Sequence, residues 1–209
     1  MATTVYIDGF NFYHGCIRDT RYHWLDFEQF AKALLPKEEV VCIKYFTARV
    51  TDRPDDPHQS QRQDTYLRAL GTLGTVKIYE GNFRTRKKRV RLVRPRVDGS
   101  LFDYALVTEE KGTDVALGAH LVWDAAHGLL TQALVVSNDS DLQVPVDMAM
   151  ELGIYVIVAN PHRHAGQAPH LHGNERRNIR RTHLEGSQLP RVVLADDGRQ
   201  IVRPSRWDP

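Results

Sequence analysis

Short, unbroken apolar runs recur along this chain and alternate with segments of helical periodicity. The runs have the length of strands: TVYID (4–8), VVCIKYFTARV (40–50), LVVS (134–137) and IYVIVAN (154–160). Unbroken apolar runs of this length are typical of parallel strands covered on both faces. The sequence therefore predicts a parallel sheet with helices on both sides.

Four segments have apolar residues at helical spacing, and several of them stop at Gly: residues 26–35, 57–73, 113–128 and 141–153. Strands that alternate with helices indicate an α/β fold. Two segments break the alternation. We expect the basic stretch at 84–96 to form a hairpin insertion with a strand at RVRLV. We expect residues 161–209 to form a C-terminal extension packed on a main domain of residues 1–160.

Composition excludes several classes of protein. With 209 residues, 42% of them hydrophobic, 14 Gly and 10 Pro, the chain is neither disordered nor collagen-like. Its longest apolar runs have six residues, whereas a membrane span needs about 20. Cys16 and Cys42 form no C-x-x-C pair, so no disulfide framework or thiolate zinc site is expected. The first ten residues do not resemble a signal peptide, and we expect a cytoplasmic protein.

Aspartates follow two of the predicted strands and open one of the predicted helices. Asp8 ends the first run within IDGFN, and Asp114 opens a helix within EEKGTDVAL. Asp139 and Asp141 follow a later run within VVSNDSDL. Functional residues of open parallel sheets collect at the carboxyl ends of the strands. We therefore expect these four carboxylates to converge.

A cluster of carboxylates favours a bound cation, because like charges raise one another's pKa and destabilise the site unless they are neutralised. Oxygen ligands select Mg²⁺ or Mn²⁺. Such ions activate water and neutralise phosphates, which indicates nuclease chemistry. The alternative is structural: Asp139 and Asp141 cap the following helix, while Asp8 and Gly9 form an ordinary turn.

Three acidic motifs, in this order and spacing, resemble the NYN domain, a branch of the PIN-like nucleases: IDGFN (7–11), EEKGTDVALGAHLVWDA (109–125) and VVSNDSDL (135–142). Further segments, from FTARV (46–50) to RPSRW (203–207), resemble one bacterial subgroup of NYN proteins. The resemblance thus covers nearly the whole chain. It implies a Rossmann-like, PIN-like parallel sheet and a metal-dependent ribonuclease.

The resemblance also implies roles for single residues. Asp8, Asp114 and Asp139 match the metal carboxylates of the family, and Asp141 fits the second acid of the SNDSD loop. Asn11 matches the asparagine that gives the family part of its name, and it would position a water or a phosphate. The implied catalytic set is therefore these four aspartates with Asn11.

The fourth metal ligand is not assigned. Many PIN-like relatives carry another acid on the helix after the third strand, where this chain has His120 and Asp124 on one side of the helix. His120 either supports Asp124 by a hydrogen bond or fills a contact between helix and sheet. Ser137 either supports the metal loop or caps a helix. Lys111 either neutralises a phosphate oxygen or is a solvated loop lysine.

The basic stretch is the best candidate for substrate contact. Eight of the thirteen residues at 84–96 are Arg or Lys, and none is acidic. Strand alternation would place Arg89 and Arg91 on one face and Val90 and Leu92 on the other. Such a basic face can follow phosphates, although a solvated hairpin without a partner is the alternative. The expected nucleic-acid contacts are Arg84, Arg86, Lys87, Lys88, Arg89, Arg91 and Lys111.

Aromatic and histidine residues suggest two further contacts. Tyr79 and Phe83 would either stack on bases or belong to the core. The segment HRHAGQAPHLH (162–172) holds four histidines, but no cysteine lies near them and a zinc site is not expected.

The leading functional hypothesis is a Mg²⁺- or Mn²⁺-dependent endoribonuclease that acts on RNA, with single-stranded DNA as the other possible substrate. The alternative is a catalytically weak RNA-binding or regulatory module with a structural metal site. A phosphatase of the haloacid-dehalogenase type is excluded, because Phe10 and Phe12 stand where that chemistry needs an acid and a hydroxyl.

Overall fold

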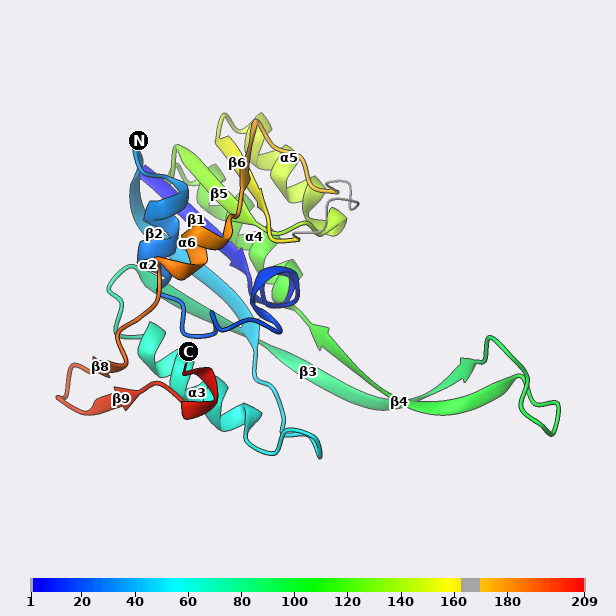
Figure 1. Ribbon diagram of the computed structural model, residues 1–209. Coiled ribbons are helices and arrows are strands. Elements are labelled where there is room, and N and C mark those ends of the chain that lie inside the picture. The colour runs from blue at the N-terminus through cyan, green and yellow to red at the C-terminus, as the bar shows by residue number, and fades with distance from the viewer. Residues whose placement is uncertain (1, 163–169, 209) are drawn as a thin grey trace.

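The computed structural model describes residues 2–162 and 170–208. In these residues a seven-stranded sheet has the order β4-β3-β2-β1-β5-β6-β7 (Figure 1). All neighbouring strands are parallel except β3 and β4, which are antiparallel. The strands are β1 (Ala2–Asp8), β2 (Glu39–Ala48), β3 (Val76–Arg91), β4 (Phe102–Lys111), β5 (Gln132–Val136), β6 (Tyr155–Asn160) and β7 (Glu175–Asn178). The predicted α/β fold is confirmed.

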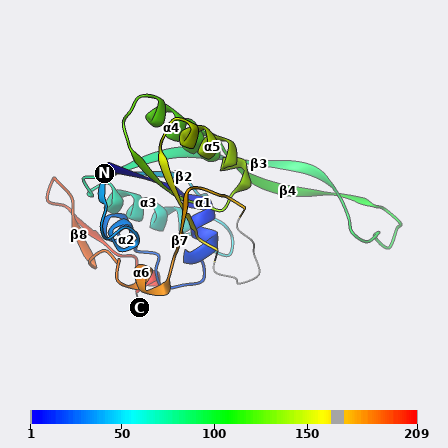
Figure 2. The same ribbon diagram turned by 90° about the horizontal axis from the view of Figure 1, so that it is seen from above.

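Helices cover both faces of this sheet (Figure 2). One face carries α1 (Gly9–Phe12), the π-helix η1 (Tyr13–Ile17), α2 (Phe27–Leu34), α3 (Gln59–Leu70) and α6 (Arg181–Glu185). The other carries α4 (Thr113–Ala126) and α5 (Gln143–Glu151), which follows the 3₁₀ helix η2 (Ser140–Leu142). Successive residues of β1 divide between the two cores: Val5 and Ile7 join the first, and Tyr6 joins the second.

The register of the central strands positions the predicted site. Ile7 of β1 lies opposite Val136 of β5, so the carboxyl ends of these two strands are adjacent. The chain enters α1 directly after β1 through Gly9. A Cβ at Gly9 would lie 2.5 Å from the backbone oxygen of Phe46, so this close approach requires glycine.

The C-terminal part of the chain adds to the sheet and to a further core. β7 pairs with β6 at the edge of the main sheet, while β8 (Val192–Leu194) and β9 (Gln200–Val202) form a separate hairpin. A third apolar cluster joins Trp24, Ala69, Leu189, Val193 and Ile201. The chain then ends in the 3₁₀ helix η3 (Ser205–Trp207).

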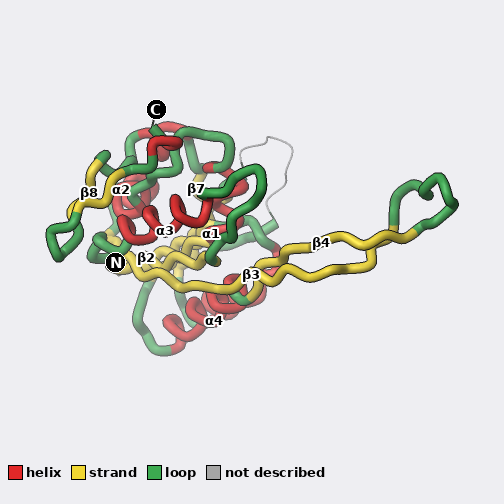
Figure 3. The backbone as a smooth tube through the Cα atoms, turned by 90° about the horizontal axis from the view of Figure 1, so that it is seen from below, coloured by secondary structure: helices red, strands yellow, loops and turns green. Residues whose placement is uncertain are grey.

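The basic hairpin is a long two-stranded arm, here called the arm (residues 82–111), that projects from the body (Figures 1 and 3). The first part of β3 pairs with β2, and from Asn82 onward β3 pairs with β4 instead. Arg89 and Arg91 are exposed and Val90 and Leu92 are half-buried, which confirms the predicted alternation. No helix within the described residues is long and apolar enough to span a membrane.

Candidate functional site

The carboxylate of Asp8 is buried at the end of β1 and held from two sides. Its Oδ1 accepts a hydrogen bond from the Asn11 backbone N–H at 2.9 Å, and its Oδ2 accepts one from Ser137 Oγ at 2.7 Å. These two hydrogen bonds hold the carboxylate in one orientation. Ser137 therefore supports this carboxylate, the first of the two roles predicted for it.

The loop after β5 presents the second carboxylate. Ser137 Oγ also accepts the backbone N–H of Asp139 at 3.1 Å, which joins the loop to Asp8. Asp139 is the N-cap of η2, and its Oδ1 accepts the backbone N–H of Asp141 at 2.9 Å. The predicted capping role of Asp139 is thus real. The cap engages Oδ1 of the carboxylate. Asp141 donates its backbone N–H to this cap and is itself exposed to solvent.

Asn11 ties the two loops together. Its Oδ1 accepts the backbone N–H of Asn138 at 3.0 Å. Asn138 Oδ1 in turn accepts the backbone N–H of His170 at 2.9 Å, which connects the C-terminal segment to the site. The Nδ2 group of Asn11 is the part of this side chain that can donate to a water or a phosphate.

Asp114 reaches the same edge of the sheet from α4. It lies in the first turn of this helix, after Gly112, whose positive φ of 94° favours glycine. Partial burial raises the pKa of Asp114, and the negative charges of Asp139 and Asp141 raise it further. The carboxylates of Asp139 and Asp141 therefore lie near enough to Asp114 for their charges to act on it.

The donor set fits a hard divalent cation. Mg²⁺ keeps several waters and needs only one or two protein carboxylates, so an open arrangement of oxygen ligands suits it. A cation would also relieve the repulsion at Asp114. Among residues 2–162 and 170–208, no three His, Cys, Asp or Glu side chains already surround a common metal position. The zinc alternative for the histidine segment involves residues 163–169, which lie outside the described residues.

His120 and Asp124 do not join this site. Asp124 lies ten residues after Asp114 on α4, about 15 Å along the helix axis. It is buried, and its Oδ2 lies 2.5 Å from both Lys44 Nζ and the Tyr6 hydroxyl, which donate to it. The sequence-based predictions did not include Lys44. The only sign of its role in the sequence is that a lysine stands within a largely apolar strand.

His120 fills a contact between helix and sheet, the second of its two predicted roles. Its ring lies 4.2 Å from that of Tyr79 and 5.6 Å from that of Phe46. Burial lowers the pKa of His120, and the charge of Lys44 lowers it further.

Tyr79 also stacks on Phe46, so it belongs to the core and not to a base-binding surface. Phe83 is half-buried at the base of the arm.

The predicted nucleic-acid residues lie along the arm and not around the aspartates. Lys111 ends β4, directly before Gly112, and is exposed. The other six are on β3, and all are exposed except the half-buried Lys88: Arg84, Arg86, Lys87, Lys88, Arg89 and Arg91. The structure thus separates an acidic site from a basic arm.

A rim of aromatic and basic residues beside Asp8 escaped the sequence reasoning. Phe10 on α1 is 50% exposed although it lies two residues after Asp8, and its ring lies 4.4 Å from that of His14. Partial burial lowers the pKa of His14, and the positive charges of Arg18 and Arg53 lower it further. Arg18 and Arg53 therefore lie near His14 on the α1 side.

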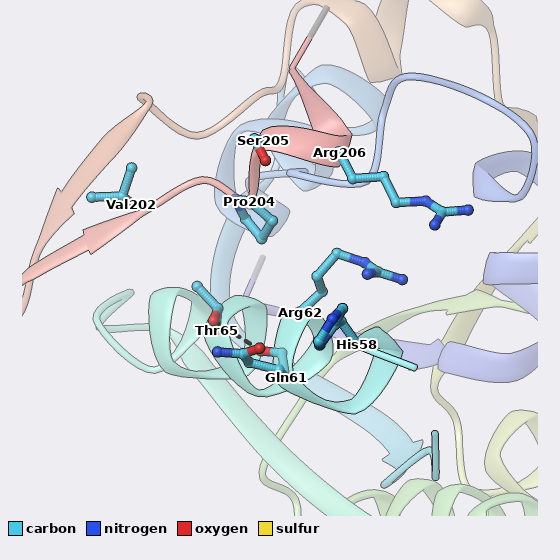
Figure 4. Close-up of a pocket in the computed structure, with 8 residues that line it drawn as sticks. All are labelled: His58, Gln61, Arg62, Thr65, Val202, Pro204, Ser205 and Arg206. Carbon is cyan, nitrogen blue, oxygen red and sulfur yellow. Dashed lines mark hydrogen bonds between the residues drawn. The ribbon is translucent and has the colours of Figure 1, made fainter. Parts of the chain in front are cut away.

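A separate pocket of about 430 Å³ lies between α3 and the C-terminal segment (Figure 4). Its walls include Arg62 from α3 and Arg206 from η3. Arg62 forms an ion pair with Asp56, and Arg206 lies 3.6 Å from the same carboxylate. Both arginines of the pocket thus share the carboxylate of Asp56, and the pocket contains none of the predicted site residues.

Comparison with known proteins gives three matches. The family model described as NYN domain matches residues 2–171. The chain is 31% identical to 6-hydroxy-3-succinoylpyridine 3-monooxygenase HspA of Pseudomonas putida, over 99% of this chain and 75% of that protein. A crystal structure of a protein of unknown function from Vibrio parahaemolyticus shares the fold, with a TM-score of 0.53 and 20% identity over 86% of this chain and 93% of that one.

Proposed function

Because this chain belongs to the NYN domain family, we propose that its aspartate cluster binds Mg²⁺ or Mn²⁺ and hydrolyses phosphodiester bonds of RNA as an endoribonuclease. Nuclease chemistry is typical of this domain. The observation that carries the proposal is that Ser137 Oγ bonds both the Asp8 carboxylate and the backbone N–H of Asp139 at the carboxyl edge of the central strands. The charge of Asp139 also acts on Asp114 from α4. Their oxygens are the ligands that these two ions prefer.

The surrounding residues fix the geometry of this site. Ser137 and the Asn11 backbone hold the Asp8 carboxylate in one orientation, and the cap at η2 does the same for Asp139. Asn11 Nδ2 would orient a water or a phosphate oxygen, and Lys111 would neutralise one. A bound divalent ion would supply a water of lowered pKa and a positive charge for the phosphate.

Removal of divalent metal is expected to abolish cleavage of labelled single-stranded RNA. EDTA should reduce the rate to that of buffer alone, and excess Mn²⁺ or Mg²⁺ should restore it, because the carboxylates alone cannot stabilise the charge of the phosphate. A parallel preparation of Asp139→Asn controls for contaminating nucleases. Full activity in EDTA after repurification would exclude the metal mechanism.

RNA affinity is expected to depend on salt through the arm. Each phosphate contact with a single strand contributes about 0.7 to the slope of log affinity against log salt. Replacing Arg86, Lys87, Lys88 and Arg89 by Gln should therefore lower this slope by up to about 3. Mn²⁺ binding, measured by calorimetry, should not change. Identical salt slopes for wild type and variant would make the arm a solvated hairpin.

Two other functions give distinct results in these assays. A binding or regulatory module with a structural metal would bind RNA but show no turnover with any divalent ion. The relative's name favours a second enzyme activity, the monooxygenation of 6-hydroxy-3-succinoylpyridine. That reaction needs O₂ and an electron donor. Oxygen consumption with this substrate and reduced nicotinamide or flavin, together with no RNA cleavage, would replace the nuclease proposal.

A further inference from the structure

The arm has two faces of different chemistry. Residues directly opposite each other in an antiparallel pair place their side chains on the same face. Arg91 lies opposite Phe102, Arg89 opposite Tyr104, and Lys87 opposite Leu106. These six residues, here called the cationic–aromatic face, therefore share one side of the arm.

The cationic–aromatic face is the open side of the arm. All six of its residues are exposed, with Tyr104 at 62% and Leu106 at 78%. On the opposite face, Arg84 and Arg86 are exposed, but Lys88, Val90, Asp103, Ala105 and Val107 are half-buried. Large aromatic and aliphatic side chains are thus exposed to solvent on an arm whose backbone projects from the body (Figure 3), which is typical of an interaction surface.

The cations and rings of this face are already in contact. Lys87 Nζ lies 4.4 Å from the centroid of the Tyr104 ring, and Arg89 Cζ lies 4.1 Å from that of Phe102. Such contacts hold long side chains against aromatic rings. The face therefore offers a row of three positive charges on β3 beside a row on β4 that contains two aromatic rings.

The net charge of the arm indicates which kind of partner it can bind. The arm contains nine Lys and Arg against four Asp and Glu, whereas the rest of the chain contains 19 against 22. One of the four acids, Asp103, forms an ion pair with Arg96. The arm is therefore the positive part of a chain that is otherwise slightly negative, and it fits a polyanion.

We propose that the cationic–aromatic face binds an unpaired nucleic-acid strand, with bases stacked on Phe102 and Tyr104 and phosphates contacted by Lys87, Arg89 and Arg91. Stacking on aromatic side chains needs bases that have left a duplex, because paired bases already stack on one another. A basic surface with rings between its charges is the combination that single-strand binding uses.

The arm also leads to the acidic site. β4 runs from Phe102 to Lys111, and the chain continues through Gly112 into the helix that carries Asp114. Tyr104 is seven residues from Lys111, about 24 Å along an extended strand. A strand on this face can thus continue to the aspartates. Its delivery there rests on the nuclease function proposed above, whereas its binding to the arm does not.

The test measures binding in EDTA, so that no cleavage occurs and a missing nuclease activity cannot be mistaken for missing binding. Fluorescence anisotropy would compare Phe102→Ala/Tyr104→Ala with the swap variant Phe102→Tyr/Tyr104→Phe, which keeps both rings. The probes are a labelled single-stranded RNA of about 20 nucleotides, a DNA of the same sequence and the RNA duplex. Circular dichroism checks that each variant is folded.

Loss of the rings is expected to weaken single-strand binding roughly 10- to 100-fold and to change duplex binding much less, while the swap variant binds like wild type. The RNA and DNA probes show which of the two strands the face prefers. Equal losses for single strand and duplex, or no loss at all, would overturn the proposal. A further result would also overturn it: the double alanine variant binds RNA like wild type but sediments as a monomer where wild type sediments as a dimer. This face would then be a contact between copies of the chain.

Discussion

Asp139→Asn is expected to lower the rate of RNA cleavage by about 100-fold or more without unfolding the chain. The change removes the charge of a proposed metal carboxylate, which contributes several kcal/mol to stabilising the transition state. Asn retains the Oδ1 that accepts the Asp141 N–H at 2.9 Å, so the cap of η2 survives. Removing the charge also lessens the repulsion of Asp114, so thermal stability without metal should stay the same or rise.

Asp139→Ala is the matched control, because it removes the cap together with the charge. It should be as inactive as Asp139→Asn but less stable by about 1 kcal/mol. Cleavage rates and thermal melts of the three proteins measure both effects. If Asp139→Asn cleaves RNA at the wild-type rate, Asp139 is a helix cap and not a ligand.

Asp124→Ala is expected to lower the free energy of unfolding by about 3–5 kcal/mol, because it leaves the charge of Lys44 buried without a partner. The ion pair lies between α4 and the sheet, and the two side chains are only 10% and 6% exposed. Tyr6 would lose its acceptor as well. Burial raises the pKa of Tyr6, and its hydrogen bond to Asp124 raises it further, so Tyr6 stays protonated and needs that acceptor.

The control for this prediction removes the whole polar cluster. Tyr6→Phe/Lys44→Met/Asp124→Leu replaces it with apolar side chains and should recover most of the lost stability, since apolar replacements of buried ion pairs are often neutral. Denaturant unfolding of both variants gives the comparison. A loss below about 1 kcal/mol for Asp124→Ala would show that water reaches Lys44.

Strands buried on both faces were predictable from their apolar runs, whereas in the exposed arm only the strand at RVRLV was predicted. β1, β2, β5 and β6 read as unbroken apolar runs because helices cover both of their sides. β4 has the sequence FDYALVTEEK, in which apolar and polar residues mix because the arm extends into solvent. No periodicity marks such a strand. A hairpin was therefore expected from the basic stretch, but the position of its second strand was not.

The residue types of the candidate site were predictable from sequence, but the hydrogen bonds and ion pairs between its residues were not. Position at strand ends identified the aspartates. The hydrogen bonds of Ser137 and Asn11 join segments more than 120 residues apart, which no local pattern reveals. The contact of Lys44 with Asp124 spans 80 residues and was missed for the same reason. The cationic–aromatic face depends on the register that places Arg89 opposite Tyr104.

A paired titration with Mn²⁺ tests most directly whether the aspartate cluster uses a metal ion to hydrolyse RNA. Calorimetry would measure Mn²⁺ binding to wild type and to Asp8→Asn, which keeps an Oδ1 acceptor for the Asn11 N–H. Cleavage of labelled single-stranded RNA would be followed over the same range of Mn²⁺ concentration. The expected result is that binding and cleavage rise together in wild type and that Asp8→Asn loses both. Wild-type protein saturated with Mn²⁺ that leaves RNA intact, or cleavage by protein that binds no Mn²⁺, would contradict the proposed function.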